Sequence, residues 1–272
     1  MRALSPAVLA HAPSGALAPV LRSAFAWTPS RPAEVVPGHK LIGRSPEIVP
    51  LVMAEFRFAE DEPDAGEAGI VVAYAVRHRG GVLLFDTGFG FGNEELDAYY
   101  RVKARRVSDV LAGVGIAMDD VTAIVNCHLH VDHAGQNAAF PGVPIYVQPA
   151  EWEIAHTTDH TILDWIDFAG ADYRPIAGDH EPVDGIRILA TPGHTVGHQS
   201  LVVSTARGDV VLAGQALYTP GEWVGDPAAR EGRSRAPDRA AYDRSVERLK
   251  ALDPAEVAFG HDRHPWTRPD PG

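Results

Sequence analysis

The stretch His128-Leu129-His130-Val131-Asp132-His133 places four potential metal ligands within six residues. Zinc prefers imidazole and carboxylate groups where thiolates are absent. In an extended loop His128 and His130 point the same way, because side chains repeat every two residues. Asp132 and His133 are adjacent in sequence, so they need a turn to aim at a neighbouring point. The spacing therefore predicts two metal positions close together.

Short apolar runs lead into polar loops around this cluster. The run at 121–125 comes two residues before His128, and the run at 186–189 leads to Thr191-Pro192-Gly193-His194. Similar runs are found at 70–76, 82–85, 143–147, 210–213 and 257–259, followed in several cases by Asp86, Gln215 or His261. Gly80-Gly81 separates two of these runs and predicts a hairpin.

Helix-like stretches lie between the predicted strands. One holds 151–155, and another is capped by Asp238 with Tyr242, Val246 and Leu249 on one face. Strands alternating with helices, and histidine-bearing loops at strand ends, predict an α/β layered domain with a loop-built site at one edge.

The chain as a whole limits the classes of function. It has 272 residues, 45% hydrophobic and 22% charged, with a formal net charge of -12. This is ordinary globular composition, and an acidic surface argues against a nucleic-acid partner. The single cysteine, Cys127, excludes an intrachain disulfide and a cysteine-based zinc finger, and it fits a reducing compartment.

The composition of the chain also indicates its domain organisation and location. Residues 1–40 are rich in Ala and Pro and are expected to form an N-terminal extension or arm, while 41–272 are expected to form a single domain. Prolines interrupt the apolar residues near the N-terminus, so no signal peptide is expected. No apolar run approaches the roughly 20 residues needed to cross a membrane. We expect a cytoplasmic protein without a membrane partner, and the arm could serve a homodimer contact.

Three further motifs accompany the first histidine cluster. They are Asp86-Thr87-Gly88, Thr191-Pro192-Gly193-His194-Thr195-Val196-Gly197-His198 and Gly260-His261-Asp262. Together with the first cluster they resemble the metallo-β-lactamase superfamily over about residues 48 to 265. The resemblance implies an α/β fold, a four-layer αββα sandwich with metals at one edge.

The resemblance also implies roles for individual residues. His128, His130 and His194 would hold a first zinc, and Asp132, His133 and His261 a second, while Asp86 would orient a ligand histidine. His198 is expected to make a structural hydrogen bond, and Cys127 to pack away from His128. The other histidines, expected on the surface or in loops, are His156, His160, His180 and His264.

One position departs from the family pattern. Where the family places an Asp that bridges two metals, this chain has Gln215. An amide offers one neutral oxygen, and its NH₂ group can only donate. Gln215 could be a weak metal ligand or hydrogen-bond a metal-bound water. We therefore expect a weakened second site and a centre holding one or two zinc ions.

Finer features are similar to N-acyl-homoserine lactonases. They are Gln148-Pro149-Ala150-Glu151-Trp152, the stretch Thr191 to Leu201, Gly260-His261-Asp262 and Tyr218. This similarity implies opening of a lactone or related ester by metal-bound hydroxide, the metal lowering the pKa of water from 15.7 toward about 7. The implied catalytic residues are Asp132, which would carry a proton to the leaving alkoxide, and Tyr218, which would hydrogen-bond the substrate.

Acyl-chain selectivity is expected to come from apolar residues around the mouth of the site: Phe89, Phe91, Trp152, Trp165, Phe168 and Trp223.

Two other functions remain open. A thioesterase of the glyoxalase type or a β-lactamase would share the metal motifs. A non-catalytic ligand-binding protein that lost activity through Gln215 belongs to a different class. A nuclease is disfavoured by the acidic charge, and an oxygen-reducing diiron protein by His130, which stands where such proteins carry a Glu.

Overall fold

The computed structural model describes residues 45–62, 64–226, 229 and 236–269. Its first sheet has the strand order β4-β1-β2-β3-β5-β6-β7. These strands are β1 (Glu47–Arg57), β2 (Ala68–His78), β3 (Gly81–Phe85), β4 (Lys103–Ala104), β5 (Val121–Val125), β6 (Pro144–Val147) and β7 (Asp172–Pro175).

The second sheet has the order β13-β12-β11-β10-β9-β8. Its strands are β8 (His180–Val183), β9 (Ile186–Ala190), β10 (Gln199–Thr205), β11 (Gly208–Leu212), β12 (Glu256–Ala258) and β13 (Trp266–Thr267). The helices are α1 (Glu94–Tyr100), α2 (Val107–Gly113), α3 (Pro149–Thr157), α4 (Leu163–Ile166), α5 (Pro220–Val224) and α7 (Arg239–Lys250).

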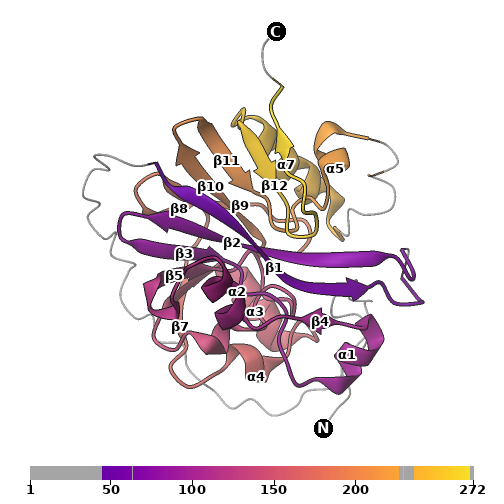
Figure 1. Cartoon of the computed structure of the whole chain (residues 1–272). Coiled ribbons are helices and arrows are strands. Elements are labelled where there is room, and N and C mark those ends of the chain that lie inside the picture. Colours follow the sequence, from indigo (N-terminus) through magenta and orange to yellow (C-terminus); the bar gives the residue numbers. More distant parts are fainter. Residues whose placement is uncertain (1–44, 63, 227–228, 230–235, 270–272) are drawn as a thin grey trace.

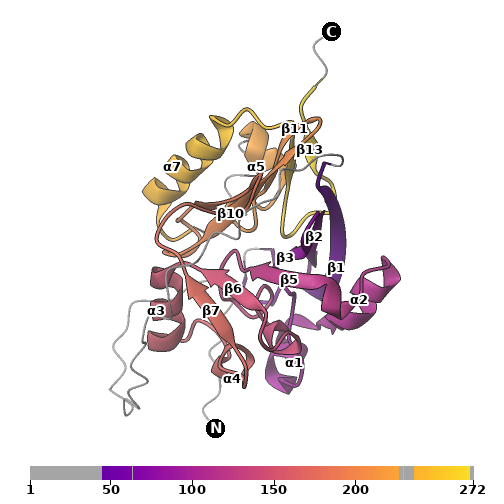
Figure 2. The ribbon, with the colours of Figure 1, turned by 90° about the vertical axis from the view of Figure 1, so that its left-hand side faces the viewer.

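The two sheets face each other and helices cover their outer faces. Figures 1 and 2 show α1 to α4 on the side of the first sheet and α5 and α7 on the side of the second. Alternate residues of β2 serve different cores, because successive side chains of a strand point to opposite faces. Val71 and Ala73 belong to the core beneath the first helices, whereas Val72 and Tyr74 lie between the sheets. This arrangement confirms the predicted four-layer αββα sandwich.

The second sheet is buried on both faces in the same way. Leu201 and Val203 of β10 join the core between the sheets, and Val202 packs with α7 through Tyr242 and Val246. The predicted helix is confirmed as α7, and its cap is Asp238, whose carboxylate accepts the Ala241 N–H at 2.9 Å. The hydrophobic face expected on this helix therefore packs against the second sheet, and α7 belongs to the fourth layer.

The predicted strands are also confirmed, with small shifts at their ends. The hairpin at Gly80-Gly81 joins β2 and β3 as an antiparallel pair in which His78 faces Gly81. The predicted helix at 151–155 is the centre of α3. Several elements were not predicted: β4, β7, β8, β10, β13, α1, α2, α4 and α5.

The N-terminal arm predicted for residues 1–40 lies outside the described residues, and so does any dimer contact that it could make. No helix among the described residues is both long and apolar enough to cross a membrane.

Candidate metal centre

The site is assembled from loops at the carboxyl ends of strands in both sheets. Loops after β3 and β5 carry the first-sheet residues Asp86, His128, His130, Asp132 and His133. Loops after β9, β11 and β12 carry the second-sheet residues His194, His198, Gln215, Tyr218 and His261. Parallel pairing of β3 with β5 and of β11 with β12 brings these ends to a common edge. The expectation that the site lies at one edge of a layered domain is confirmed.

Hydrogen bonds join the two sheets at this edge. The Gln199 N–H donates to the Cys127 carbonyl at 2.8 Å, and the Val72 N–H donates to the Gly260 carbonyl at 2.8 Å. The Tyr74 hydroxyl donates to the Phe259 carbonyl at 2.7 Å. The loops that bear His128 and His261 are therefore held in place across the sandwich before any metal binds.

Three histidines converge at the first predicted metal position. His128 Nε2 lies 2.9 Å from His130 Nδ1, and His194 Nε2 lies 3.3 Å from the same atom. Burial, together with the neighbouring imidazoles, lowers the pKa of His128 and His130 well below the usual value. Both rings are thus neutral at neutral pH, which is the form that binds metals.

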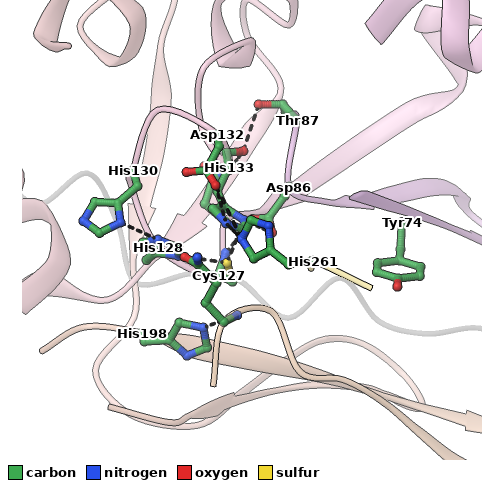
Figure 3. A network of polar contacts seen from close by, with 12 residues as sticks. Tyr74, Asp86, Thr87, Cys127, His128, His130, Asp132, His133, His198 and His261 are labelled. Atoms are coloured by element: carbon green, nitrogen blue, oxygen red, sulfur yellow. Dashed lines mark hydrogen bonds and ion pairs between the residues drawn. The ribbon is translucent and has the colours of Figure 1, made fainter. Parts of the chain in front are cut away.

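A second group forms around Asp132. Asp132 Oδ2 lies 3.3 Å from His133 Nε2 and 3.5 Å from His261 Nε2, and these two nitrogens are 3.3 Å apart. Burial favours the neutral carboxyl, but the facing His133 and His261 outweigh it and hold the pKa of Asp132 below its usual value. Figure 3 shows His128, His130, His133 and His261 gathered with Asp132 in one cluster.

Other groups set which ring nitrogen of each histidine is exposed to this cluster. Asp86 Oδ2 lies 2.8 Å from His133 Nδ1, and Asp86 Oδ1 accepts the Cys127 N–H at 2.7 Å. The Ile70 carbonyl accepts from His261 Nδ1 at 2.7 Å. The contacts at His133 Nδ1 and His261 Nδ1 keep the proton on Nδ1 and turn Nε2 toward Asp132. Asp86 has a φ of 68°, which is unusual for a residue with a side chain and indicates strain kept at a functional position.

The residues fit a metal by a test that is independent of their spacing. Asp132 Oδ1 and Gln215 Oε1 are buried and have no hydrogen-bond partner among the described residues. Buried polar atoms are normally hydrogen-bonded, so unpaired oxygens beside converging imidazoles indicate a site for a cation. Among the described residues, four sets of three groups have ligand atoms within 4.8 Å of one another, and two of these sets consist of predicted ligands alone: His128, His130 and His194, and His128, Asp132 and His133.

Gln215 and Tyr218 form a pair beside this cluster. The Gln215 amide NH₂ donates to the Tyr218 hydroxyl, and the Tyr218 ring stacks on His261 with centroids 4.8 Å apart and planes at 16°. Gly214 allows the loop to pack here, since a Cβ on it would lie 2.7 Å from the Cys127 Cβ and its φ is 60°. The loop after β11 therefore holds Gln215 beside Tyr218, in the pocket that Asp132 and His261 also line.

A pocket opens onto this cluster. Its lining residues are Phe56, Phe58, Glu62, Tyr100, Asp132, Gln215, Tyr218 and His261. Four of them come from the predicted site, and the other four, from β1, the β1–β2 loop and α1, were not predicted. None of the six apolar residues expected at the mouth lines this pocket. Phe89 is buried in the first core, where it packs against Trp165, and Trp223 is buried beneath α7.

One expectation about a neighbouring residue was wrong. Cys127 does not point away from the cluster: its Sγ lies 3.0 Å from His128 Nδ1 and 3.2 Å from His133 Nδ1. The turn between Cys127 and His128 departs from the extended geometry that the expectation assumed. Burial raises the pKa of the Cys127 thiol, so it stays protonated and packs as a small side chain.

His160 lies in the loop between α3 and α4, as expected, but it is buried rather than on the surface. It is 7% exposed, its ring centroid lies 4.3 Å from that of His130, and its Nε2 lies 2.6 Å from Glu151 Oε1. Glu151 also accepts the Leu129 N–H at 2.9 Å and the Thr195 hydroxyl at 2.5 Å. One buried carboxylate thus joins the loop of His128 and His130 to the loop of His194. Glu151 is 0% exposed, but the sequence of such a short helix does not indicate which of its residues are buried.

His198 holds the base of the site by hydrogen bonds. Its Nε2 accepts the Gln215 N–H at 3.0 Å, and its Nδ1 lies 3.1 Å from the Thr191 carbonyl oxygen. This is the structural hydrogen bonding expected from the sequence. Both ring nitrogens are engaged by backbone, which leaves the metal cluster to the other histidines.

Comparison with known proteins agrees with this architecture. Residues 66–261 match the family described as the metallo-β-lactamase superfamily. The chain belongs to this superfamily. Among solved structures, a quorum-quenching N-acyl homoserine lactone hydrolase superposes with a TM-score of 0.65 at 29% identity, covering 81% of this chain and 93% of that one. The same class of hydrolase, with the product N-hexanoyl-L-homoserine bound at its catalytic metal centre, gives a TM-score of 0.67 at 28% identity, covering 81% and 94%.

Curated relatives in sequence are named as N-acyl homoserine lactonases. An N-acyl homoserine lactonase of Bacillus sp is 38% identical over 166 residues, 58% of this chain and 62% of that protein. The match thus spans less than two thirds of that relative's length. An N-acyl homoserine lactonase of Azorhizobium caulinodans is 32% identical over 225 residues, 75% of this chain and 77% of that protein. The resemblance inferred from the motifs is confirmed.

Proposed function

We propose that this protein is a metal-dependent hydrolase that opens N-acyl homoserine lactones or closely related lactones. The observation that carries the proposal is the pocket in which Asp132, Tyr218 and His261 face a common space beside the histidine cluster. Both sets of relatives, in sequence and in structure, include proteins named for this activity.

We further propose zinc as the metal, because the donor set consists of imidazoles and a carboxylate. His128, His130 and His194 would hold one ion, and Asp132, His133 and His261 a second. Bound there, zinc would lower the pKa of a water molecule to near 7 and polarise the ester carbonyl. The same donors accept Mn, Fe or Co, so the choice of zinc is itself to be tested by metal analysis.

Asp132 has the properties of a proton carrier in this reaction. Its Oδ2 faces His133 and His261, Oδ1 has no hydrogen-bond partner in the described part of the chain, and the residue lines the pocket. Its lowered pKa keeps it ionised at neutral pH. Asp132 would accept the proton lost by the attacking water and return it to the alkoxide when the ring C–O bond breaks, so that protons balance over the cycle.

Tyr218 would bind the substrate on the other side of the pocket. Its hydroxyl accepts from the Gln215 amide, which orients the phenolic O–H as a donor. A donor aimed at the position of the developing negative charge stabilises the transition state more than the ground state. Tyr218 would therefore hydrogen-bond the lactone carbonyl or the leaving oxygen.

A substrate panel tests this proposal. The metal-loaded protein is assayed with acyl homoserine lactones of short and long chain, acyl-glutathione thioesters and nitrocefin, with His130→Ala as control. Ring-opened acyl homoserine should form at a rate that His130→Ala abolishes. Faster turnover of thioesters or nitrocefin would identify a thioesterase or β-lactamase instead.

Gln215 favours one candidate from another class, a ligand-binding protein without turnover. A neutral amide at the bridging position would leave the cations less well balanced by charge than a carboxylate. That candidate predicts lactone binding in calorimetry without product, even with zinc or manganese supplied.

A further inference from the structure

The pocket contains a second carboxylate besides Asp132. Glu62 lies in the β1–β2 loop, is 7% exposed, and lines the pocket together with Asp132, Gln215 and His261. Asp132 and Glu62 are the acidic residues among its lining groups, and none of the lining groups in the described chain is Lys or Arg. A buried carboxylate is costly unless it is paired with a cation or well hydrogen-bonded.

The structure holds Glu62 in this position. The loop is closed by the Phe58 N–H donating to the Glu67 carbonyl at 3.1 Å, and the Glu62 N–H donates to the Ala59 carbonyl at 3.1 Å. The Tyr100 hydroxyl, from α1, donates to Glu62 Oε1 at 3.2 Å. Burial and the adjacent Glu62 raise the pKa of Tyr100, so the phenol remains protonated and can donate.

Aromatic rings enclose this side of the pocket. Phe56 meets the rings of Tyr100 and His261 edge to face, at centroid distances of 6.1 Å and 6.2 Å. Phe58 packs on Phe56 at 5.0 Å. An apolar wall lowers the local dielectric, so a charge on Glu62 interacts strongly with any cation held by Asp132 and His261.

Gln215 leaves the second metal position short of negative charge. With a neutral amide there, Asp132 would be the single anionic ligand among the residues assigned to the two cations. The unpaired Gln215 Oε1 and Asp132 Oδ1 both belong to residues that line the pocket Glu62 enters. A carboxylate reaching this space from the opposite sheet would restore the charge that the loop after β11 lacks.

We propose that Glu62 is a carboxylate donor to the cation at the second position, replacing from the β1–β2 loop the carboxylate that Gln215 has removed. Glu62 contacts the cation directly or through one water molecule, with Gln215 Oε1 as a neutral partner. The proposal needs metal binding but not lactone hydrolysis, so the two can fail separately.

Metal binding to the apoprotein tests this role. Wild type, Glu62→Gln and Asp61→Asn are stripped with chelator and titrated with Zn²⁺ by calorimetry and with Co²⁺ by visible absorption. Asp61 is a matched control, because it is the next residue in the loop, is exposed, and accepts from Tyr99 as Glu62 accepts from Tyr100. Glu62→Gln should weaken the second equivalent by about 10- to 100-fold and change its Co²⁺ spectrum, while Asp61→Asn leaves both unchanged.

A second pair of variants links the effect to Gln215. In a Gln215→Asp background, which returns the carboxylate to its usual place, Glu62→Gln should cost much less affinity than in the wild type. Should Glu62→Gln disturb folding, as judged by apoprotein unfolding, Glu62→Ala removes the carboxylate without placing an amide beside Tyr100. Equal affinities in wild type and Glu62→Gln, equal losses in Glu62→Gln and Asp61→Asn, or no second equivalent in the wild type would each overturn the proposal.

Discussion

Tyr218 combines a fixed ring with an oriented hydroxyl. The ring stacks on His261, and the hydroxyl accepts from Gln215, so removing the oxygen alone leaves the packing intact. Tyr218→Phe should lower kcat for lactone opening by about 100-fold, the effect of deleting one oxyanion donor, with metal content unchanged. Steady-state kinetics beside metal analysis checks this. A higher KM with kcat unchanged would show that Tyr218 only binds the substrate.

Asp86 contacts His133 and is not among the residues that line the pocket. It holds His133 Nδ1 at 2.8 Å and the Cys127 N–H at 2.7 Å. Asp86→Asn should reduce metal affinity by about 10- to 100-fold, because an amide no longer fixes the tautomer of the ring as firmly. Competition with a chromogenic chelator measures this. Unaltered affinity at the weaker site would contradict the role.

At this scale the sequence predicted the polar residues of the metal cluster, because their types and spacing follow from coordination chemistry. It did not predict His160 or Glu62. Both lie in stretches of ordinary loop composition. Only tertiary contacts bring His160 to His130 and Glu62 to the pocket. The direction of Cys127 was wrong for the same reason, since it depends on the backbone of one turn.

Among the elements, α3 connects two site loops through Glu151. Its carboxylate is fully buried and accepts from Leu129, His160 and Thr195. Glu151→Ala should reduce the unfolding free energy of the apoprotein by roughly 3–5 kcal/mol, as expected when one partner of a buried charged network is removed.

Glu153, on the same helix and exposed, provides the control for this change. Glu153→Ala should alter stability by less than about 0.5 kcal/mol. Urea unfolding of both variants gives the comparison. Similar losses in the two would mean that α3 is sensitive to any substitution and that the network has no special role.

The elements that could be predicted are those with a clear pattern of their own. The strand at 121–125 was predicted from a short apolar run, and the helix capped by Asp238 from apolar residues that share one face. Strand β10 escaped prediction, although five of its residues, from Gln199 to Val203, are buried. Its first two residues are polar and pair with other polar groups inside, so the strand lacks a recognisable apolar start.

For the whole molecule, the cluster of candidate metal ligands is built by loops from both sheets at one edge of the sandwich. His128, His130 and His133 come from the first sheet's loops, and His194 and His261 from the second's. A bound ion would therefore stabilise the contact between the two halves of the sandwich. Chelation should lower the melting temperature, and Zn²⁺ or Mn²⁺, but not Mg²⁺, should restore it, since imidazole donors suit the former ions.

Differential scanning calorimetry with and without chelator tests this coupling. A matched variant, His264→Ala, removes an exposed histidine and should respond to chelator as the wild type does. An unchanged melting temperature on chelation of the wild type would contradict a metal shared by the two sheets.

The arrangement of the layers could be predicted only through the family resemblance. The chain's own pattern predicted strands and helices in alternation, but not which strands pair. The sheet order places β5 beside β3, and β12 beside β11, across long stretches of sequence. Such pairings depend on the burial of both faces of each sheet, which a local pattern does not contain.

The central claim, a metal-dependent lactonase, is tested most directly by one measurement. Ring opening of an N-acyl homoserine lactone is followed by chromatography for the zinc-loaded protein, for the chelated protein and for His130→Ala. We predict acyl homoserine as product with the loaded protein, none above background with the other two, and recovery when zinc is returned to the chelated protein. Lactone binding without product from the zinc- or manganese-loaded protein would contradict the account.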